Sequence, residues 1–128
     1  IHREFVKKFE SVSSDLDQLM FGQQFLKIVD FLKVYANFCA NQQQSVATLE
    51  RCRTNNSEFD LFIRTCSRNP ECKNLSLESF LIKPVQRICK YPLLLKELIR
   101  DTPEDHGDYA ALNKAHQIVN DIVTQINE

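Results

Sequence analysis

The sequence contains very little glycine and proline. Only two glycines, Gly22 and Gly107, and four prolines interrupt its 128 residues. A β-sheet protein needs short alternating apolar and polar runs separated by turn residues, and such runs are missing here. The scarcity of turn residues therefore argues against a β-rich fold and predicts an all-α protein. The length fits one domain built around one core.

Signatures of catalysis are also missing. The sequence has no glycine-rich phosphate loop, no Walker pattern and no HExxH motif. Its three histidines are scattered, and paired carboxylates such as Asp15 and Asp17 fall in turn-like segments, where capping and solvation account for them. We therefore expect no catalytic residues, no cofactor and no bond chemistry.

Cysteine usage and hydropathy bear on the compartment. The five cysteines are an odd number at irregular spacings, and no signal-like apolar segment accompanies them. No histidine lies near Cys66 and Cys72, which argues against a zinc site. No apolar run approaches the roughly 20 residues that span a bilayer. These features predict a reduced, cytoplasmic protein without a metal site, and leave recruitment to the inner face of the plasma membrane open.

Apolar residues at helical spacing predict the secondary structure. The predicted helices cover about residues 1–11, 23–40, 46–55, 59–66, 76–99 and 105–128. Ser13, Ser14 and Asp15 are available as caps for a short turn that ends near Gly22. In the helix at 23–40, Phe31, Val34 and Phe38 widen the apolar stripe until little polar face remains, so we expect this helix to be central. The last helix begins with acidic residues, including Asp108, that suit a helix N-terminus. It carries a packing seam of Leu112, Ala115, Val119, Ile122 and Ile126.

The segment from 81 to 99 has two opposed faces on a 3.6-residue period. One is apolar and comprises Leu81, Val85, Ile88, Pro92, Leu95 and Ile99, and the other carries Lys83, Gln86, Lys90 and Glu97. The apolar face is expected to join the core, which leaves the polar face for a partner. Two prolines interrupt the pattern, so we expect a bend near each, or a short turn before Pro84 with the main helix beginning there.

Charge is distributed unevenly along the chain. Residues 83–100 carry five basic residues against one acidic residue, whereas residues 101–128 carry six acidic residues against one basic residue. A nucleic-acid-binding protein would show a sustained basic excess, so no nucleic-acid partner is expected.

The segment KPVQRICKYPLLL resembles the third conserved region of Dbl homology domains, the guanine nucleotide exchange factors (GEFs) of Rho-family GTPases. The matching residues are Pro84, Val85, Gln86, Arg87, Lys90, Tyr91, Pro92, Leu93, Leu94 and Leu95. The resemblance covers nearly the whole chain, less strongly before Phe25, and includes residues 31–45, the run from Asn55, Thr102, Pro103, Asp108, Tyr109, Leu112 and the terminal Ile126, Asn127 and Glu128. The resemblance implies an elongated helical bundle that binds GTPase switch regions and regulates the GTPase without being an enzyme itself.

The resemblance also implies roles for individual residues. Lys90 matches a basic residue that reaches switch II, Gln86 matches a neighbouring contact, and Asn127 matches a switch II contact on the last helix. Ile82 falls where members differ by GTPase subgroup, and isoleucine there resembles Rac-directed members.

Other residues of this segment are assigned less specifically. Ser79 and Lys83 are expected at the rim of the interface, and Arg87 is either a contact or part of an internal salt bridge. Burial preferences favour core positions for Val85, Tyr91, Leu93 and Leu95.

Some features depart from the family pattern. By the resemblance, the family's first conserved region, with a glutamate that contacts switch I, is expected upstream of Ile1, and no pleckstrin homology domain is expected within residues 1–128. We therefore expect a single partial domain over residues 1–128, shortened at the N-terminus and also at the C-terminus, with self-association of the truncated bundle. The alternative function is a helical interaction module that binds a protein partner or an acidic membrane surface through its basic stripe, without exchange.

Overall fold

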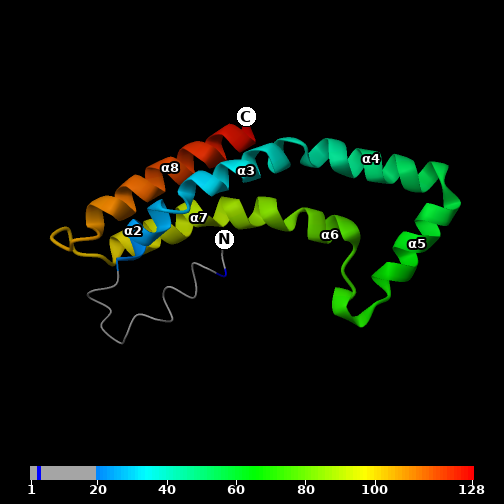
Figure 1. The fold of residues 1–128 in the computed structure, drawn as a ribbon, viewed down its shortest axis with the longest axis horizontal. Coiled ribbons are helices and arrows are strands. Elements are labelled where there is room, and N and C mark those ends of the chain that lie inside the picture. Colours follow the sequence, from blue (N-terminus) through cyan, green and yellow to red (C-terminus); the bar gives the residue numbers. More distant parts are fainter. Residues whose placement is uncertain (1–2, 4–19) are drawn as a thin grey trace.

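The computed structural model describes Arg3 and residues 20–128, and the described residues form helices without a strand. Apart from Arg3, the helix predicted over residues 1–11 lies outside the described residues, as do the predicted caps Ser13, Ser14 and Asp15. The elements are α2 (Phe21–Leu26), α3 (Val29–Ala40), α4 (Gln42–Asn55), α5 (Ser57–Ser67), the 3-10 turn η2 (Pro70–Cys72), α6 (Leu77–Leu81), α7 (Lys83–Arg100) and α8 (Tyr109–Asn127). The prediction of an elongated all-α fold is confirmed (Figure 1).

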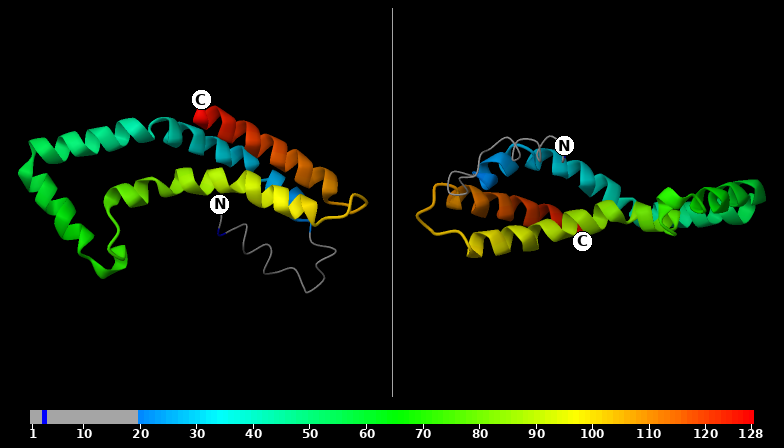
Figure 2. Two further views of the ribbon diagram at one scale, coloured as in Figure 1. Left: turned by 180° about the vertical axis from the view of Figure 1, so that it is seen from behind. Right: turned by 90° about the horizontal axis from the view of Figure 1, so that it is seen from below.

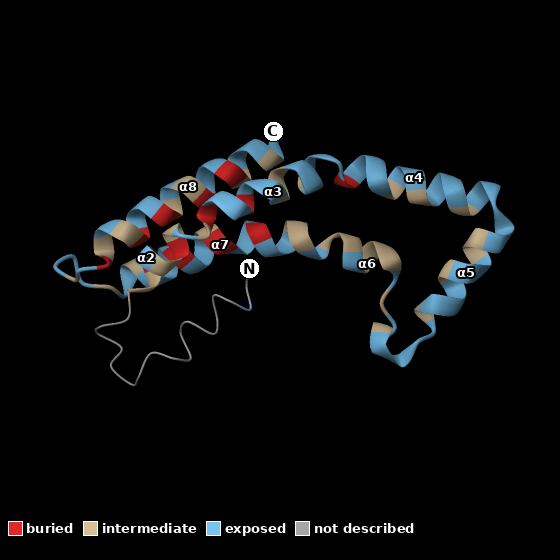
Figure 3. Cartoon of the chain, in the orientation of Figure 1, coloured by how far each residue is buried: buried red, intermediate tan, exposed pale blue. Residues whose placement is uncertain are grey.

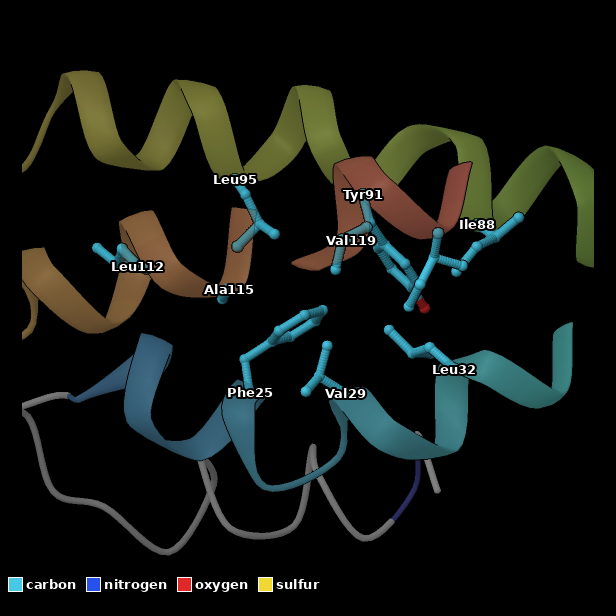
Figure 4. Close-up of a cluster of buried hydrophobic side chains, with 10 residues drawn as sticks. Phe25, Val29, Leu32, Ile88, Tyr91, Leu95, Leu112, Ala115 and Val119 are labelled. Carbon is cyan, nitrogen blue, oxygen red and sulfur yellow. The ribbon is translucent and has the colours of Figure 1, made fainter. Parts of the chain in front are cut away.

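A bundle of α2, α3, α7 and α8 holds the hydrophobic core. In two views α7 and α8 run side by side, joined by the loop after Arg100 (Figure 2). The core side chains point into the space between the helices (Figure 4). They are Phe25, Val29, Leu32, Ile88, Tyr91, Leu95, Leu112, Ala115, Val119 and Ile122. The seam predicted on the last helix is confirmed, with Ile126 packed at its edge.

The helix predicted over residues 23–40 is broken in two. The amides of Lys27, Ile28 and Phe31 bond to carbonyl groups three residues earlier, which tightens the backbone between α2 and α3. Phe25 and Val29 both reach the core across this break, at 4% and 3% exposure.

The outer part of the wide apolar face predicted for the same segment is not buried. Phe31, Val34 and Phe38 are 55%, 67% and 38% exposed. Successive residues of a helix are rotated by about 100°, so the apolar side chains of α3 point in several directions. The helices packed against one side of α3 cannot bury all of them.

The prolines of the central segment act differently from one another. α6 ends at Leu81, and α7 starts at Lys83 with Pro84 in its first turn, where a missing amide costs nothing. The second of the two predicted arrangements, a short turn before Pro84, is therefore confirmed. Pro92 lies inside α7 without ending it.

Asp108 holds the start of the first described helix. Its carboxylate accepts hydrogen bonds from the Gly22 amide at 2.6 Å and the Gln23 amide at 3.0 Å, and the residue is 2% exposed. Asp108 stands at the N-cap position of α8, at the start of the last helix as predicted, but its side chain makes no capping hydrogen bond there. The side chain caps α2 instead. Gly22 permits the contact, because a Cβ there would lie 2.6 Å from the Leu112 nitrogen.

Beyond the bundle, α4, α5, η2 and α6 form a segment that we call the distal arm (Figure 1). Buried residues are concentrated in the bundle, as Figure 3 shows. Within the arm α5, η2 and α6 bury none, and α4 buries Gln42 alone. The arm is therefore held by half-buried packing and polar contacts rather than by a core of its own.

Candidate functional site

The site predicted from the sequence begins at the junction of α6 and α7. Ser76 caps α6 by accepting a hydrogen bond from the Ser79 amide at 3.2 Å, and the two hydroxyl oxygens lie 2.9 Å apart. Ser79 is half-buried and hydrogen-bonded within its own turn, at the end of the arm nearest α7. Ile82 follows as the residue shared by the two helices, and its carbonyl accepts the Gln86 amide at 3.0 Å.

An open groove lies between α3 and the first turns of α7. Its lining comprises Tyr35, Phe80, Lys83, Pro84, Gln86, Arg87 and Lys90. The structure therefore brings four of the seven predicted site residues together, with two aromatic rings and no acidic residue in the lining. Gln86 and Lys90 are exposed and stand one helical turn apart, as the helical period predicted.

Two lysines give the groove positive charge. Lys83 places its Nζ 4.9 Å from the centre of the Phe80 ring, a cation–π contact. The salt bridges found among residues 20–128 include neither Lys83 nor Lys90. Both ammonium groups are consequently available to an acidic partner.

Arg87 contacts the core rather than an acid. Its Nε donates a hydrogen bond to the Tyr91 hydroxyl at 3.1 Å, and its guanidinium lies 5.6 Å from the centre of that ring. The hydrogen bond to Tyr91 is the main reason that the pKa of Arg87 is raised. Burial raises the pKa of Tyr35, which faces the same groove. The two alternatives for Arg87 were a partner contact and an internal salt bridge; its internal contact is with a tyrosine.

Asn127 does not line the groove. It is the last residue of α8 and is exposed. Because α8 runs antiparallel to α7, its C-terminal end lies towards the first turns of α7, as Figure 2 shows. Ile126, beside it, packs against the core cluster that contains Ile88. Asn127 is thus at the same end of the bundle as Gln86, outside the groove lining.

The core assignments within α7 are correct in part. Tyr91 and Leu95 are buried, at 8% and 3% exposure, and Val85 is half-buried. Leu93 was predicted to be in the core and is 61% exposed. The reason is geometric, since three consecutive leucines on a helix cover almost a full turn and Leu95 takes the inward position.

Tyr35 and Phe80 were missed as groove residues. Phe80 had a usable signal, because it precedes Lys83 by three residues and therefore shares its face. Tyr35 had none, because its place in the groove depends on how α3 packs against α7.

The described residues contain no group of three His, Cys, Asp or Glu side chains positioned to hold a metal ion. No helix in that part of the chain is both long enough and apolar enough to cross a bilayer. What the groove offers is a positive, aromatic-walled docking surface, suited to binding acidic groups on a macromolecule.

Comparison with known proteins identifies the class of this helical bundle. The RhoGEF domain family matches residues 1–127. The chain is 42% identical over 129 residues to the Myosin-M heavy chain of Dictyostelium discoideum, covering 100% of this chain and 7% of that protein. It is 36% identical over 135 residues to the phosphatidylinositol 3,4,5-trisphosphate-dependent Rac exchanger 2 protein of Homo sapiens, covering 100% and 8%.

The fold is also similar to that of solved structures. A crystal structure of the PDZ-RhoGEF DH/PH domains in complex with GTP-gamma-S activated RhoA superposes with a TM-score of 0.82 at 23% identity, over 98% of this chain and 37% of that chain. The protein belongs to the RhoGEF, or Dbl homology, family. It spans less than a tenth of the length of the two curated relatives.

Proposed function

We propose that this chain is a guanine nucleotide exchange factor domain for a Rho-family GTPase. The observation that carries the proposal is the groove, in which the family motif places Lys83, Gln86 and Lys90 on one exposed face without acidic partners among the described residues. Membership of the RhoGEF family supports the same activity. Lys90, Gln86 and Asn127 would contact switch II, with Ile82, Lys83, Arg87 and Ser79 around them.

The mechanism follows from linkage between two ligands of the GTPase. A nucleotide bound at picomolar strength contributes about 16 kcal/mol, so an exchange factor must bind the empty GTPase far more tightly than the loaded one. By reciprocity, bound nucleotide lowers the affinity of the GTPase for the exchange factor as much as the exchange factor lowers its affinity for nucleotide. The chain supplies differential binding, and no bond is made or broken.

A preference for Rac-type GTPases is the finer proposal. Isoleucine at position 82 supports it, and so does similarity to a protein named a Rac exchanger.

We further propose a cytoplasmic location with recruitment to the inner face of the plasma membrane. The partial character of the domain remains a prediction. The exposed apolar side chains on α3 support self-association.

The test is release of fluorescent GDP from a panel of Rho-family GTPases. Lys90→Ala should lower the exchange rate about ten-fold or more, as expected for a central interface residue, while leaving the melting temperature unchanged because Lys90 is exposed. Lys96→Ala is the matched control, an exposed lysine on the same helix that does not line the groove. Equal rates for Lys90→Ala and the parent, or no release from any GTPase, would contradict the proposal.

The basic groove also favours a second candidate, an interaction module for an acidic membrane surface. Pelleting with vesicles rich in phosphatidylserine, run beside the exchange assay, separates the two. Vesicle binding that depends on Lys83 and Lys90, without GDP release, would assign the groove to a membrane.

A further inference from the structure

The distal arm is joined to itself by a cluster of charged side chains that the groove does not use. Arg53 of α4 donates from Nε to Asp60 of α5 at 2.6 Å and from Nη1 to Glu78 of α6 at 3.5 Å. Asp60 also forms an ion pair with Arg64, with 2.9 Å between Arg64 Nε and Asp60 Oδ2. Arg53 thus connects three helices of the arm through one guanidinium.

The cluster is partly buried, in a part of the molecule that has no buried core of its own. The side chains of Arg53, Asp60 and Glu78 are 26%, 20% and 31% exposed, whereas that of Arg64 is 66% exposed. Neither α5 nor α6 contributes a buried residue. The hydrogen bond from Arg53 is also the main reason that the pKa of Asp60 is lowered. Partly desolvated charged hydrogen bonds are stronger than surface ion pairs.

A backbone path leads from this cluster to the groove. The carbonyl of Glu78 accepts the Ile82 amide at 3.1 Å, and the carbonyl of Ile82 accepts the Gln86 amide at 3.0 Å. Phe80, two residues after Glu78, lies under the Lys83 ammonium. Rotation of α6 would therefore shift Ile82 and Lys83, at the edge of the site where partner preference is expected to reside.

We infer that Arg53 is a positioning residue, which orients α6 through Glu78 and so sets how Ile82 and Lys83 meet the GTPase. Arg53 is not among the residues that line the groove. In this proposal it makes no contact with the GTPase. The inference rests on the proposed exchange function for its kinetic effect, while its structural effect on the α6–α7 junction is independent of that function.

The experiment uses Arg53→Met, which keeps an unbranched side chain and removes the guanidinium, in the 128-residue protein. GDP release from the preferred GTPase should fall about two- to thirty-fold, the range for a residue that acts through a coupled element. Arg64→Met is the matched control, since it removes an exposed ion pair to the same Asp60, and its rate should equal that of the parent. Glu78→Gln keeps a hydrogen-bond acceptor for Arg53 and should lose less than Glu78→Ala.

Combining substitutions distinguishes positioning from general destabilisation. When Lys83→Ala has already removed one of the two contacts at that end, adding Arg53→Met should have a smaller further effect, exerted through Ile82 alone. Added to Asn127→Ala, at the other side of the site, it should have its full effect. The same fold-loss in both backgrounds would overturn the inference, as would a parental rate for Arg53→Met alone.

Amide hydrogen exchange provides a readout that needs no GTPase. The Ile82 and Gln86 amides should exchange faster in Arg53→Met than in Arg64→Met, with the amides of α8 unchanged. If the parent protein released no GDP, the proposed function would fall while this measurement still decided the inference. Equal protection of Ile82 and Gln86 in the two variants would refute it.

Discussion

Replacing Asp108 by alanine tests whether the contact between the starts of α2 and α8 stabilises the fold. The carboxylate accepts two amide hydrogen bonds from α2 in a site where Asp108 is 2% exposed. A hydrogen bond to a charged group contributes about 1.5–3 kcal/mol, so two contribute about 3–6 kcal/mol. Because water can enter the space left by the side chain, we expect the lower half of this range.

A loss of about 3–4 kcal/mol would be a large share of the roughly 5–15 kcal/mol that stabilises an ordinary domain. For a protein of this size it lowers the melting temperature by about 10–15 °C. Thermal and urea unfolding followed by far-ultraviolet circular dichroism measure both quantities, and a two-state fit gives the free energy of unfolding.

Asp105→Ala is the control, because Asp105 is an exposed carboxylate in the same loop and should change stability by less than about 0.5 kcal/mol. Asp108→Asn should fall between parent and alanine variant, since its amide oxygen can accept one of the two bonds while its NH₂ group faces the other amide. If Asp108→Ala unfolded at the temperature of the parent, the contact would contribute no stability and the reasoning would be refuted.

Three further predictions concern packing and pH. Gly22→Ala should cost about 1–3 kcal/mol, because its Cβ would meet backbone of α8, whereas Gly107→Ala meets only the end of the Met20 side chain and should be tolerated; equal unfolding temperatures for the two variants would contradict this. Leu95→Ala should cost about 2–5 kcal/mol in urea unfolding, whereas Leu93→Ala, at an exposed position, should cost under about 1 kcal/mol, and the reverse order would overturn the assignment of faces. The pKa of Asp60 is lowered below the ordinary 3.8, so the stability that its carboxylate contributes is present above pH 3.8 and is lost as the pH falls through the lowered value. The melting temperatures of the parent and of Asp60→Asn should therefore converge in acid. A gap that stayed constant with pH would disprove this prediction.

The sequence was sufficient to predict those elements whose burial follows from local periodicity. Ile88 and Leu95 repeat at helical spacing and are buried, and Pro84 marks the start of α7 because the first turn is where a helix tolerates proline best. Gln86 and Lys90 share an exposed face for the same reason.

The remaining features depend on contacts between distant segments. Gln42 is buried although it is polar, and its Oε1 has no hydrogen-bond partner among the described residues. Tyr35 reaches the groove only through the packing of α3 against α7. The carboxylate of Asp108 could have capped its own helix, and the choice of α2 is made by the close approach that Gly22 allows.

The contact between Gly22 and Asp108 also constrains how the protein is made. The two residues are 86 positions apart, and the core residues of α2 and α3 pack against α8, which is synthesised after all the other described helices. At about 5–20 residues per second, a ribosome needs about 4–17 s to reach Asp108 after it has added Gly22. During that interval Phe25, Val29 and Leu32 have no α8 to pack against. The contacts that α2 and α3 make with α8 can therefore form only after α8 has left the ribosome.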